Sequence, residues 1–227
     1  MGQALLASET AAVERALIQM FGLHLLQVGC WGEPDQFLKF ARTRRQALIA
    51  ETSEPGVAAL SSPSRLAIAS DSVDAVLLPH TLETDAEPHQ VLREVDRVLV
   101  GEGHLIVLGF NPWSAWGARH FATRGKFPNG THRLIPEKRM RDWLSLLGME
   151  VSKSRRCVHT PPIDRESVQR RLSGLEQTGA RYWPRLSGAY ILVAQKRVYS
   201  VTPMRPQWKR KPRLAGGLVE PTTRSAA

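Results

Sequence analysis

The arrangement of apolar and polar positions between residues 70 and 109 predicts a strand, a helix, a turn and a second strand, in that order. The run 73–78 is apolar and rich in β-branched side chains, as a strand buried on both faces would be. Apolar residues then recur at helical spacing over 91–99, with polar residues on the opposite side. A glycine turn at 101–103 leads to another buried strand at 105–108. This order is that of a βαβ unit, from which parallel sheets covered by helices are built.

This unit also has a characteristic amino-acid sequence. It contains the stretches SDSVDAVLL, HTLE, REVDRVL and GEGHLIVL. In these stretches it resembles the second half of class I S-adenosylmethionine-dependent methyltransferases, and within them the type 11 group that acts on small molecules. The resemblance extends from about His24 to Arg197 and is strongest across 70–109. It implies an α/β fold with a Rossmann-like, doubly wound, mostly parallel seven-stranded sheet and helices on both faces.

The remaining elements of that fold can be assigned along the chain. A helix over 9–21 would carry Val13 and Leu17 on one side. The segment 132–151 resembles the family's last helix and sixth strand, with Gly148 ending the helix. The other expected elements are strands at 25–28, 47–50, 57–60 and 187–197, the last of which resembles the closing seventh strand.

Composition limits the class of protein. A chain of 227 residues with 42% apolar residues can bury one α/β domain, and we expect this methyltransferase-like domain to span 1–199 with an insert at 158–187. Cys30 and Cys157 provide neither a disulfide framework nor metal-ligand spacing, so no metal site is expected. The sequence shows no secretory signal and no apolar run of membrane-spanning length. These features predict a cytoplasmic protein that does not enter the membrane.

The C-terminal residues 200–227 differ from the rest of the chain. From Lys196 onward there are eight basic residues and one acidic residue, Glu220, in a chain of net charge +10, and four prolines follow Tyr199. This composition predicts a disordered basic tail. Such a tail, with Trp208 near its centre, can bind nucleic acid or another acidic partner through phosphate contacts and stacking. A solvated tail that aids solubility is the alternative.

The glycine turn after the first strand is the expected cofactor site, because open parallel sheets bind ligands beyond the carboxyl ends of their strands. Gly29 and Gly32 would let the backbone approach S-adenosylmethionine closely. The family has an acidic residue at the strand end, where this chain has Gln27, and a middle glycine, where this chain has Trp31. Trp31 can wall off the adenosine and leave room for the cofactor, or it can fill the pocket.

Three further residues are expected to contact the cofactor. Glu51 ends the second strand 22 residues after Gly29, about the spacing at which dinucleotide-type folds hold ribose hydroxyls with an acid. An ordinary exposed loop glutamate is the alternative. Ser62 stands near the place of the family's adenine-contacting acid and can hydrogen-bond the adenine amine. Leu78 ends the fourth strand beside the same pocket.

The acceptor side is expected just after the fourth and fifth strands. Methyl transfer is an in-line displacement, so most of its rate comes from alignment of the reactants. His80, with an ordinary pKa of about 6.5, is the candidate base, and Glu83 can orient His80 or the substrate. Alternatively, His80 only shapes the pocket through packing and a hydrogen bond. Asn111 and Trp113 are expected at the substrate mouth, where 123–132 is predicted to be a flexible lid.

Two functions remain open at this point. The leading hypothesis is an S-adenosylmethionine-dependent methyltransferase that acts on a small-molecule acceptor. The alternative is a non-catalytic protein of the same fold that serves as an interaction or nucleic-acid-binding module. Gln27, Trp31 and Ser62, which depart from the family pattern, favour the alternative. Glu51 and the intact edge after the fourth strand favour the enzyme.

Overall fold

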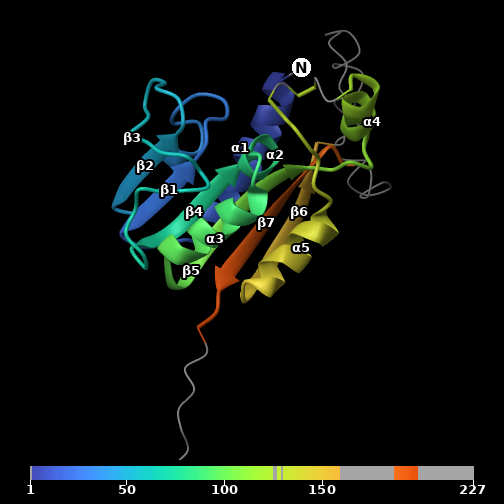
Figure 1. Ribbon diagram of the computed structural model, residues 1–227. Coiled ribbons are helices and arrows are strands. Elements are labelled where there is room, and N and C mark those ends of the chain that lie inside the picture. The colour runs from blue at the N-terminus through green and yellow to red at the C-terminus, as the bar shows by residue number, and fades with distance from the viewer. Residues whose placement is uncertain (1, 125–126, 129, 159–186, 199–227) are drawn as a thin grey trace, which may run out of the picture.

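A computed structural model describes residues 2–124, 127–128, 130–158 and 187–198. In this part of the chain, seven strands form one sheet in the order β3-β2-β1-β4-β5-β7-β6 (Figure 1). The strands are β1 (His24–Val28), β2 (Arg45–Ala50), β3 (Ala59–Leu60), β4 (Val73–Pro79), β5 (Leu99–Phe110), β6 (Met149–Cys157) and β7 (Ala189–Lys196). The helices are α1 (Gly2–Leu17), the 3-10 helix η1 (Leu38–Phe40), α2 (Thr81–Thr84), α3 (Pro88–Val98), α4 (Ala115–Ala122) and α5 (Glu137–Leu146).

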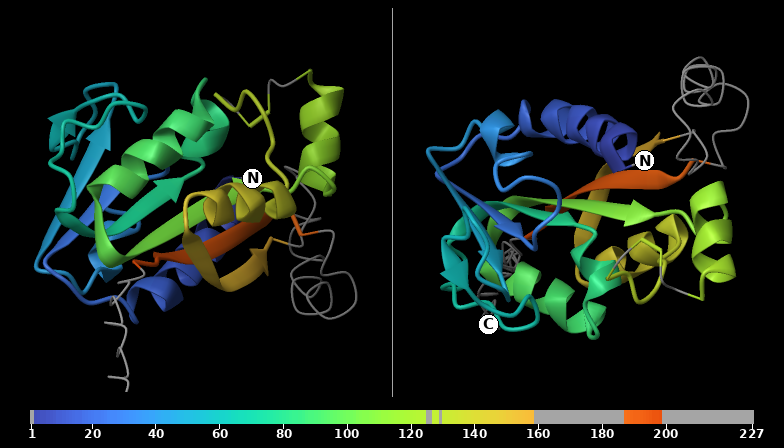
Figure 2. Two further views of the ribbon diagram at one scale, coloured as in Figure 1. Left: turned by 60° about the horizontal axis from the view of Figure 1, so that its bottom comes forward. Right: turned by 90° about the horizontal axis from the view of Figure 1, so that it is seen from above.

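The sheet is mostly parallel and covered on both faces, as predicted. β1 to β5 pair in parallel, and β7 is antiparallel to its two neighbours, β5 and β6. α1 lies against one face, and α3 and α5 lie against the other (Figure 2). Alternate side chains of β4 therefore enter different apolar clusters. Ala75 and Leu77 pack in the cluster with α1. Val76 and Leu78 pack in the cluster with α3 and α5.

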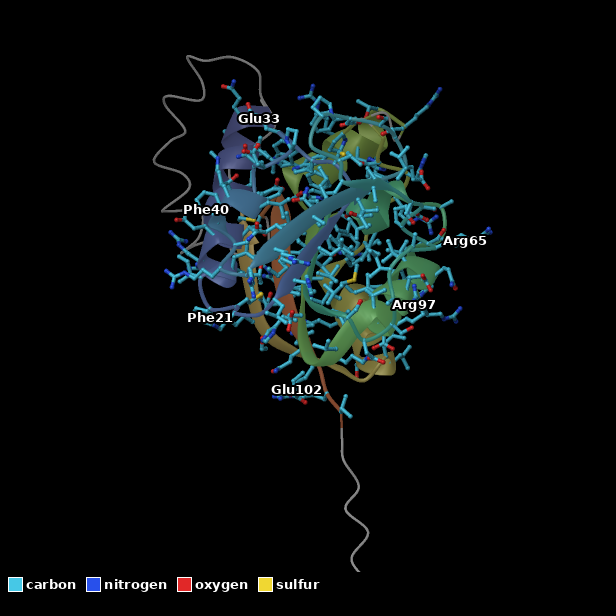
Figure 3. All side chains as sticks on the ribbon, turned by 90° about the vertical axis from the view of Figure 1, so that its left-hand side faces the viewer. Phe21, Glu33, Phe40, Arg65, Arg97 and Glu102 are labelled. Atoms are coloured by element: carbon cyan, nitrogen blue, oxygen red, sulfur yellow. The ribbon has the colours of Figure 1, made fainter. Side chains whose placement is uncertain are left out.

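α3 begins three residues before the apolar positions at 91–99 that predict it. Pro88 stands at the first helical position, where a missing N–H costs no hydrogen bond. Just before it, Asp85 Oδ1 accepts a hydrogen bond from the backbone N–H of Glu87 at 2.7 Å. At the other end, Arg97 donates to the carbonyl oxygens of Leu66 and Ile68 (Figure 3). The helix thereby holds the loop that precedes β4.

β5 is longer than the predicted strand at 105–108. It starts at Leu99, whose fully buried side chain belongs to the core. The expected glycine turn at 101–103 is an irregularity inside the strand, where the register with β4 shifts. Glu102 there has a φ of +63°. The residues between Leu99 and His104 do not pair with β4, and pairing resumes at His104.

α1 begins earlier than the predicted helix at 9–21 and also ends earlier. Val13 and Leu17 are buried against the sheet, as expected. Met20 is buried in the turn that follows the helix, whereas Phe21 is exposed. The apolar pattern therefore continues past the end of the helix because the turn itself packs on the sheet.

Several predicted segments are not part of the described structure. The insert at 158–187 lies outside the described residues except for its two end residues, and the tail at 200–227 lies outside them entirely. Three residues of the predicted lid at 123–132 also lie outside. Among the helices that are described, none combines the length and the apolar character needed to cross a membrane.

Candidate functional site

The carboxyl ends of β1 and β4 meet at the centre of the sheet. Strand order reverses between them, since β2 and β3 lie beyond β1 and β5 lies beyond β4. An open α/β sheet binds ligands at such a switch point. The segments that leave the two strands are in contact, because Thr81 Oγ1 donates a hydrogen bond to the carbonyl oxygen of Val28. The candidate site is built from these segments.

The turn after β1 requires its two glycines. Gly29 has a φ of +92° and Gly32 a φ of +74°, which residues with a Cβ rarely adopt. A Cβ on Gly29 would lie 2.7 Å from Thr81 Oγ1, and one on Gly32 would lie 2.9 Å from a methyl carbon of Leu6 in α1. The turn is therefore packed between α1 and the segment that follows β4.

Gln27 lies next to this turn, near the end of β1, with only 1% of its surface exposed. Its Nε2 donates to the carbonyl oxygen of Gly29 at 3.1 Å. Its buried Oε1 has no hydrogen-bond partner among the described residues. Buried polar atoms are nearly always hydrogen-bonded in folded proteins. A donor group on a bound ligand would satisfy this oxygen.

Glu51 and Ser62 lie together at the carboxyl ends of β2 and β3. Ser62 Oγ donates to Glu51 Oε1 at 2.7 Å, and Ser64 Oγ lies 3.1 Å from Ser62 Oγ. Glu51 is exposed and Ser62 is half-buried. The two side chains that sequence analysis expects at the ribose and the adenine are therefore direct neighbours at the same edge of the sheet.

His80, directly after β4, is fully buried between two carboxylates. Its Nδ1 lies 2.9 Å from Glu83 Oε2, and its Nε2 lies 2.8 Å from Glu9 Oε1 of α1. None of the three residues is more than 1% exposed. The backbone of His80 has a φ of +58°, a region that few residues other than glycine occupy. Both ring nitrogens are occupied by protein partners, an arrangement that fits packing and hydrogen bonding better than proton transfer to a substrate.

Glu9, His80 and Glu83 are called the buried charge cluster below. Burial alone would lower the pKa of His80, but the charge of Glu9 and the hydrogen bonds to both carboxylates outweigh it and raise this pKa to about 9. Burial also raises the pKa of Glu83, against the hydrogen bonds that it accepts. In this cluster the imidazolium lies between the two carboxyl groups, out of contact with water.

Glu83 joins three segments of the site. Its carboxylate accepts hydrogen bonds from the backbone N–H groups of Phe110, at 2.9 Å, and Ile135, at 3.4 Å. Its carbonyl oxygen accepts a hydrogen bond from His132 N at 2.8 Å. Glu83 therefore fixes the end of β4 relative to the end of β5 and to the segment before α5.

Trp31 packs against the buried charge cluster. Its indole N–H donates to Glu9 Oε2 at 2.8 Å. The ring centroid lies 4.4 Å from that of His80 and 5.9 Å from that of Phe110. The His80 and Phe110 rings stack at 4.0 Å. The half-buried Trp31 is thus held between α1 and the ends of β4 and β5.

The other predicted site residues lie farther along the edge or in the core. Leu78 is fully buried in the cluster on the α3 and α5 face. Asn111 follows β5, where its Nδ2 donates to Ser187 O at 2.9 Å and its Oδ1 accepts from Trp113 N at 3.1 Å. Trp113 is 76% exposed.

A cavity of about 280 Å³ opens beside these last residues, at the carboxyl ends of β5 and β6. Its walls come from the start of α5, the end of β6 and the first residues of β7. The lining includes Asn111, Trp113, Glu137, Lys138, Arg156 and Tyr190. The structure therefore brings the two residues predicted at the substrate mouth to one cavity.

Sequence analysis missed Glu9. Leu5, Glu9, Val13 and Leu17 recur every four residues along α1, and all four are buried. A charged residue within such an apolar stripe signals a buried partner, because carboxylates are rarely buried unless they are paired. Its partner His80 lies 71 positions away, so the pattern does not identify the other half of the pair.

Comparisons with known proteins agree with this geometry. A family model described as a methyltransferase domain matches residues 34–107. The uncharacterized protein YafS of Escherichia coli K12 is 35% identical over 211 residues, or 89% of this chain and 82% of YafS. A Thermotoga maritima structure, described as an S-adenosylmethionine-dependent methyltransferase and possible histamine N-methyltransferase, has a TM-score of 0.65 at 16% identity over 86% of this chain and 91% of its own. The [4+2]-cyclase SpnF has a TM-score of 0.57 at 19% identity over 84% of this chain and 80% of its own.

These findings complement one another. At such low identity the two solved structures show the fold. The family model covers the segment from just after the glycine turn to the middle of β5, and the similarity to YafS covers most of the chain. The packed glycine turn and the unsatisfied oxygen of Gln27 fit a bound cofactor. The chain therefore belongs to the class I S-adenosylmethionine-dependent methyltransferases, and S-adenosylmethionine is its cofactor.

Proposed function

We propose that this methyltransferase acts on a small-molecule acceptor, bound in the cavity at the carboxyl ends of β5 and β6. The volume of the cavity, about 280 Å³, carries the proposal. It is near the lower end of the range for small-molecule sites. The cavity also reaches the carboxyl end of β5, the strand next to β4, on the edge from which this fold presents its cofactor.

The walls of the cavity suit a polar acceptor with a planar part. Burial opposes ionisation of Glu137, but hydrogen bonds from Ser154, Arg141 and Arg156 lower the pKa of Glu137. The cavity therefore offers a fixed carboxylate in its wall. The exposed indole of Trp113 offers a flat apolar surface at its entrance.

The residues around the switch point are proposed to hold and align the cofactor. S-adenosylmethionine supplies the electrophilic methyl group. Gly29 and Gly32 give its methionine part room, Gln27 Oε1 accepts a hydrogen bond, and Glu51 with Ser62 binds the adenosine. In this proposal the side chain of Leu78 supports the site from the core. These assignments rest on the turn geometry and on the Glu51–Ser62 hydrogen bond.

His80 and Glu83 are proposed to act by positioning. Through Glu83 they fix the ends of β4 and β5, and through Glu9 they fix α1. The two carboxyl groups of the buried charge cluster, at the switch point, favour a cationic ligand beside them. A sulfonium is such a cation, so Glu9 can supply the negative field that the family obtains from the acid at the position of Gln27.

Replacing Glu51 with alanine should weaken S-adenosylmethionine binding about tenfold, because ligand hydroxyls lose their acceptor. Calorimetric titration of the folded protein measures the change. Asp142→Ala is the matched control, since it removes another exposed carboxylate, on α5, and should change affinity less than twofold. Equal affinities for the Glu51→Ala protein and its parent would contradict the assignment of Glu51.

Replacing Trp113 with alanine should raise the KM for the acceptor about tenfold and leave S-adenosylmethionine affinity unchanged. The acceptor is found by measuring release of S-adenosylhomocysteine in the presence of small amines, phenols, thiols and carboxylates. Phe121→Ala, which removes another exposed aromatic side chain, is the matched control and should keep the parent KM. Turnover with RNA or protein acceptors alone would overturn the proposal, although the protein would remain a methyltransferase.

A further inference from the structure

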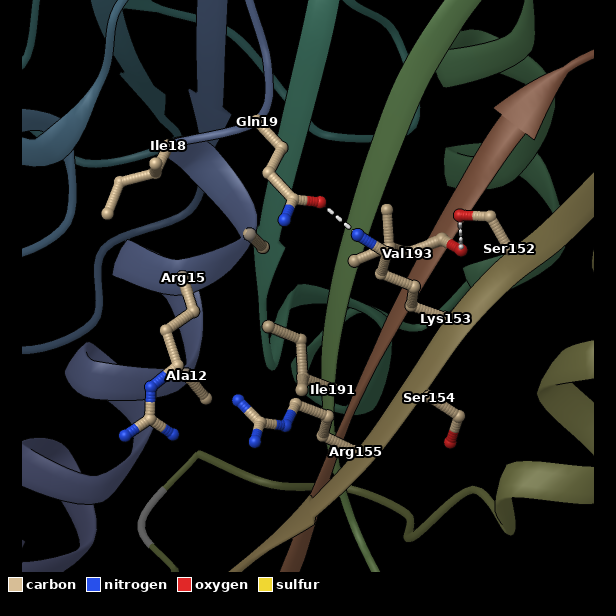
Figure 4. A pocket seen from close by; sticks show the side chains of 11 residues that line it. Ala12, Arg15, Ile18, Gln19, Ser152, Lys153, Ser154, Arg155, Ile191 and Val193 are labelled. Carbon is tan, nitrogen blue, oxygen red and sulfur yellow. Dashed lines mark hydrogen bonds between the residues drawn. The ribbon is translucent and has the colours of Figure 1, made fainter.

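A second, larger hollow lies on the face of the sheet rather than at its carboxyl edge. It is a groove of about 700 Å³ between α1 and the strands β6 and β7 (Figure 4). Its lining residues include none of those at the switch point or in the acceptor cavity. Because α1 covers this face only in part, β6 and the adjacent part of β7 form the open side of the groove.

The floor of the groove is apolar. Ile191 and Val193 project from β7, and Ala12 and Ala16 face them from α1. The two small alanine side chains keep α1 from filling the space above the strand. Ala12, Ile191 and Val193 are nearly buried, whereas Ile18, at one end of α1, is 39% exposed. An apolar ligand that lies here would cover Ile18 and the remaining exposed part of the floor, which is favourable.

The rim of the groove is basic. Arg15 extends from α1, and Lys153 and Arg155 extend from β6 toward the same space (Figure 4). The described lining residues include no Asp or Glu. Lys153 donates a hydrogen bond to the side chain of Gln19 at one end. Arg15 and Arg155 have no ion pair or side-chain hydrogen bond with any described residue.

The geometry points to a binding site for an anionic amphiphile, specifically a single-chain alkyl carboxylate. The floor matches a hydrocarbon chain, and the two guanidinium groups match a carboxylate, which they can bind through paired N–H donors. Each feature restricts the ligand. A neutral chain would leave the cations unpaired, and a fully polar anion would leave the apolar floor in water.

Titration with octanoate and decanoate, each below its micelle concentration, tests this inference by calorimetry on the full chain. Both should bind, and decanoate about tenfold more tightly, because it buries two further methylenes. 1-Octanol, which has the same chain length without the charge, should bind at least tenfold more weakly than octanoate. Equal affinities for octanol and octanoate would overturn the inference. So would the absence of binding of either carboxylate at millimolar concentration.

Arg15→Gln and Arg155→Gln should each weaken decanoate binding about five- to tenfold, and together they should abolish it. Arg44→Gln is the matched control, since it removes an exposed arginine outside the groove lining and should change affinity less than twofold. Thermal melting checks that every variant is folded. Unchanged binding by the double variant, or binding to phosphatidylglycerol vesicles without binding to free decanoate, would show that the groove is not this site.

Discussion

Replacing His80 with glutamine is expected to lower the free energy of unfolding by about 3–5 kcal/mol, the usual effect of removing one partner from a buried ion pair. The change takes away the imidazolium and leaves the carboxylates of Glu9 and Glu83 buried at the same place. A neutral amide can donate a hydrogen bond to one of them but cancels neither charge. Urea denaturation of parent and variant measures the difference.

His132→Gln is the matched control, because this imidazole is exposed and its loss should change stability by about 0.5 kcal/mol or less. A second variant, Glu9→Gln combined with His80→Gln, removes one of the two carboxyl groups that faced the imidazolium. It should be more stable than His80→Gln alone, which is the coupling expected of contacting residues. A His80→Gln protein as stable as the parent would contradict the structural role and return His80 to the candidate bases.

Raising the pH from 7 to 9 is expected to destabilise the protein by about 2–3 kcal/mol. The pKa of His80 is about 9 in the folded protein, against 6.5 ordinarily. Between these values the folded state holds one proton more than the unfolded state. The stability that this proton contributes is complete below pH 6.5 and is lost as pH rises toward 9, at about 1.4 kcal/mol per pH unit.

Unfolding midpoints at pH 7, 8 and 9 measure this loss for the parent and for His80→Gln. The variant should be insensitive to pH over the same window, to within about 0.5 kcal/mol. Burial raises the pKa of Cys30 from 9.0 to about 11, so this thiol lowers stability only near the top of the window, by about 0.4 kcal/mol at pH 9 in parent and variant alike. Burial raises the pKa of Tyr190 well above its ordinary value, so its effect begins at higher pH. A parent whose stability is constant from pH 7 to 9 would show that the imidazole is not held as a cation.

The spacing of apolar residues predicted the elements whose structure depends mainly on neighbouring residues in the sequence. Strand β4, helix α3 and the core of β5 follow from apolar runs, helical spacing and Pro88. The spacing of apolar residues within each segment indicates which of its side chains are buried. The glycine turn inside β5 was misplaced as a strand boundary. Pairing with β4 on both sides of this turn, which is not local, joins the two parts into one strand.

The site was less predictable, because it is made by contacts between distant residues. His80, Glu83 and the two glycines were predicted as site residues from their places after strands. Glu9 was missed, since the sequence shows only a carboxylate on an apolar helix face and not the imidazole that faces it. The role of Trp31 was left open for the same reason, as its indole N–H bonds to this missed residue.

The salt link between α1 and the end of β4 also bears on the order in which the chain folds. Glu9 is synthesised before its partners His80 and Glu83, which follow it by more than 70 positions. Until β4 and β5 are in place, docking of α1 on the sheet would bury an unpaired carboxylate, which is strongly unfavourable. The large loop between the partners adds a closure cost before any contact is gained. The helix α1, which precedes the strands along the chain, is therefore expected to dock late, after the central strands have assembled.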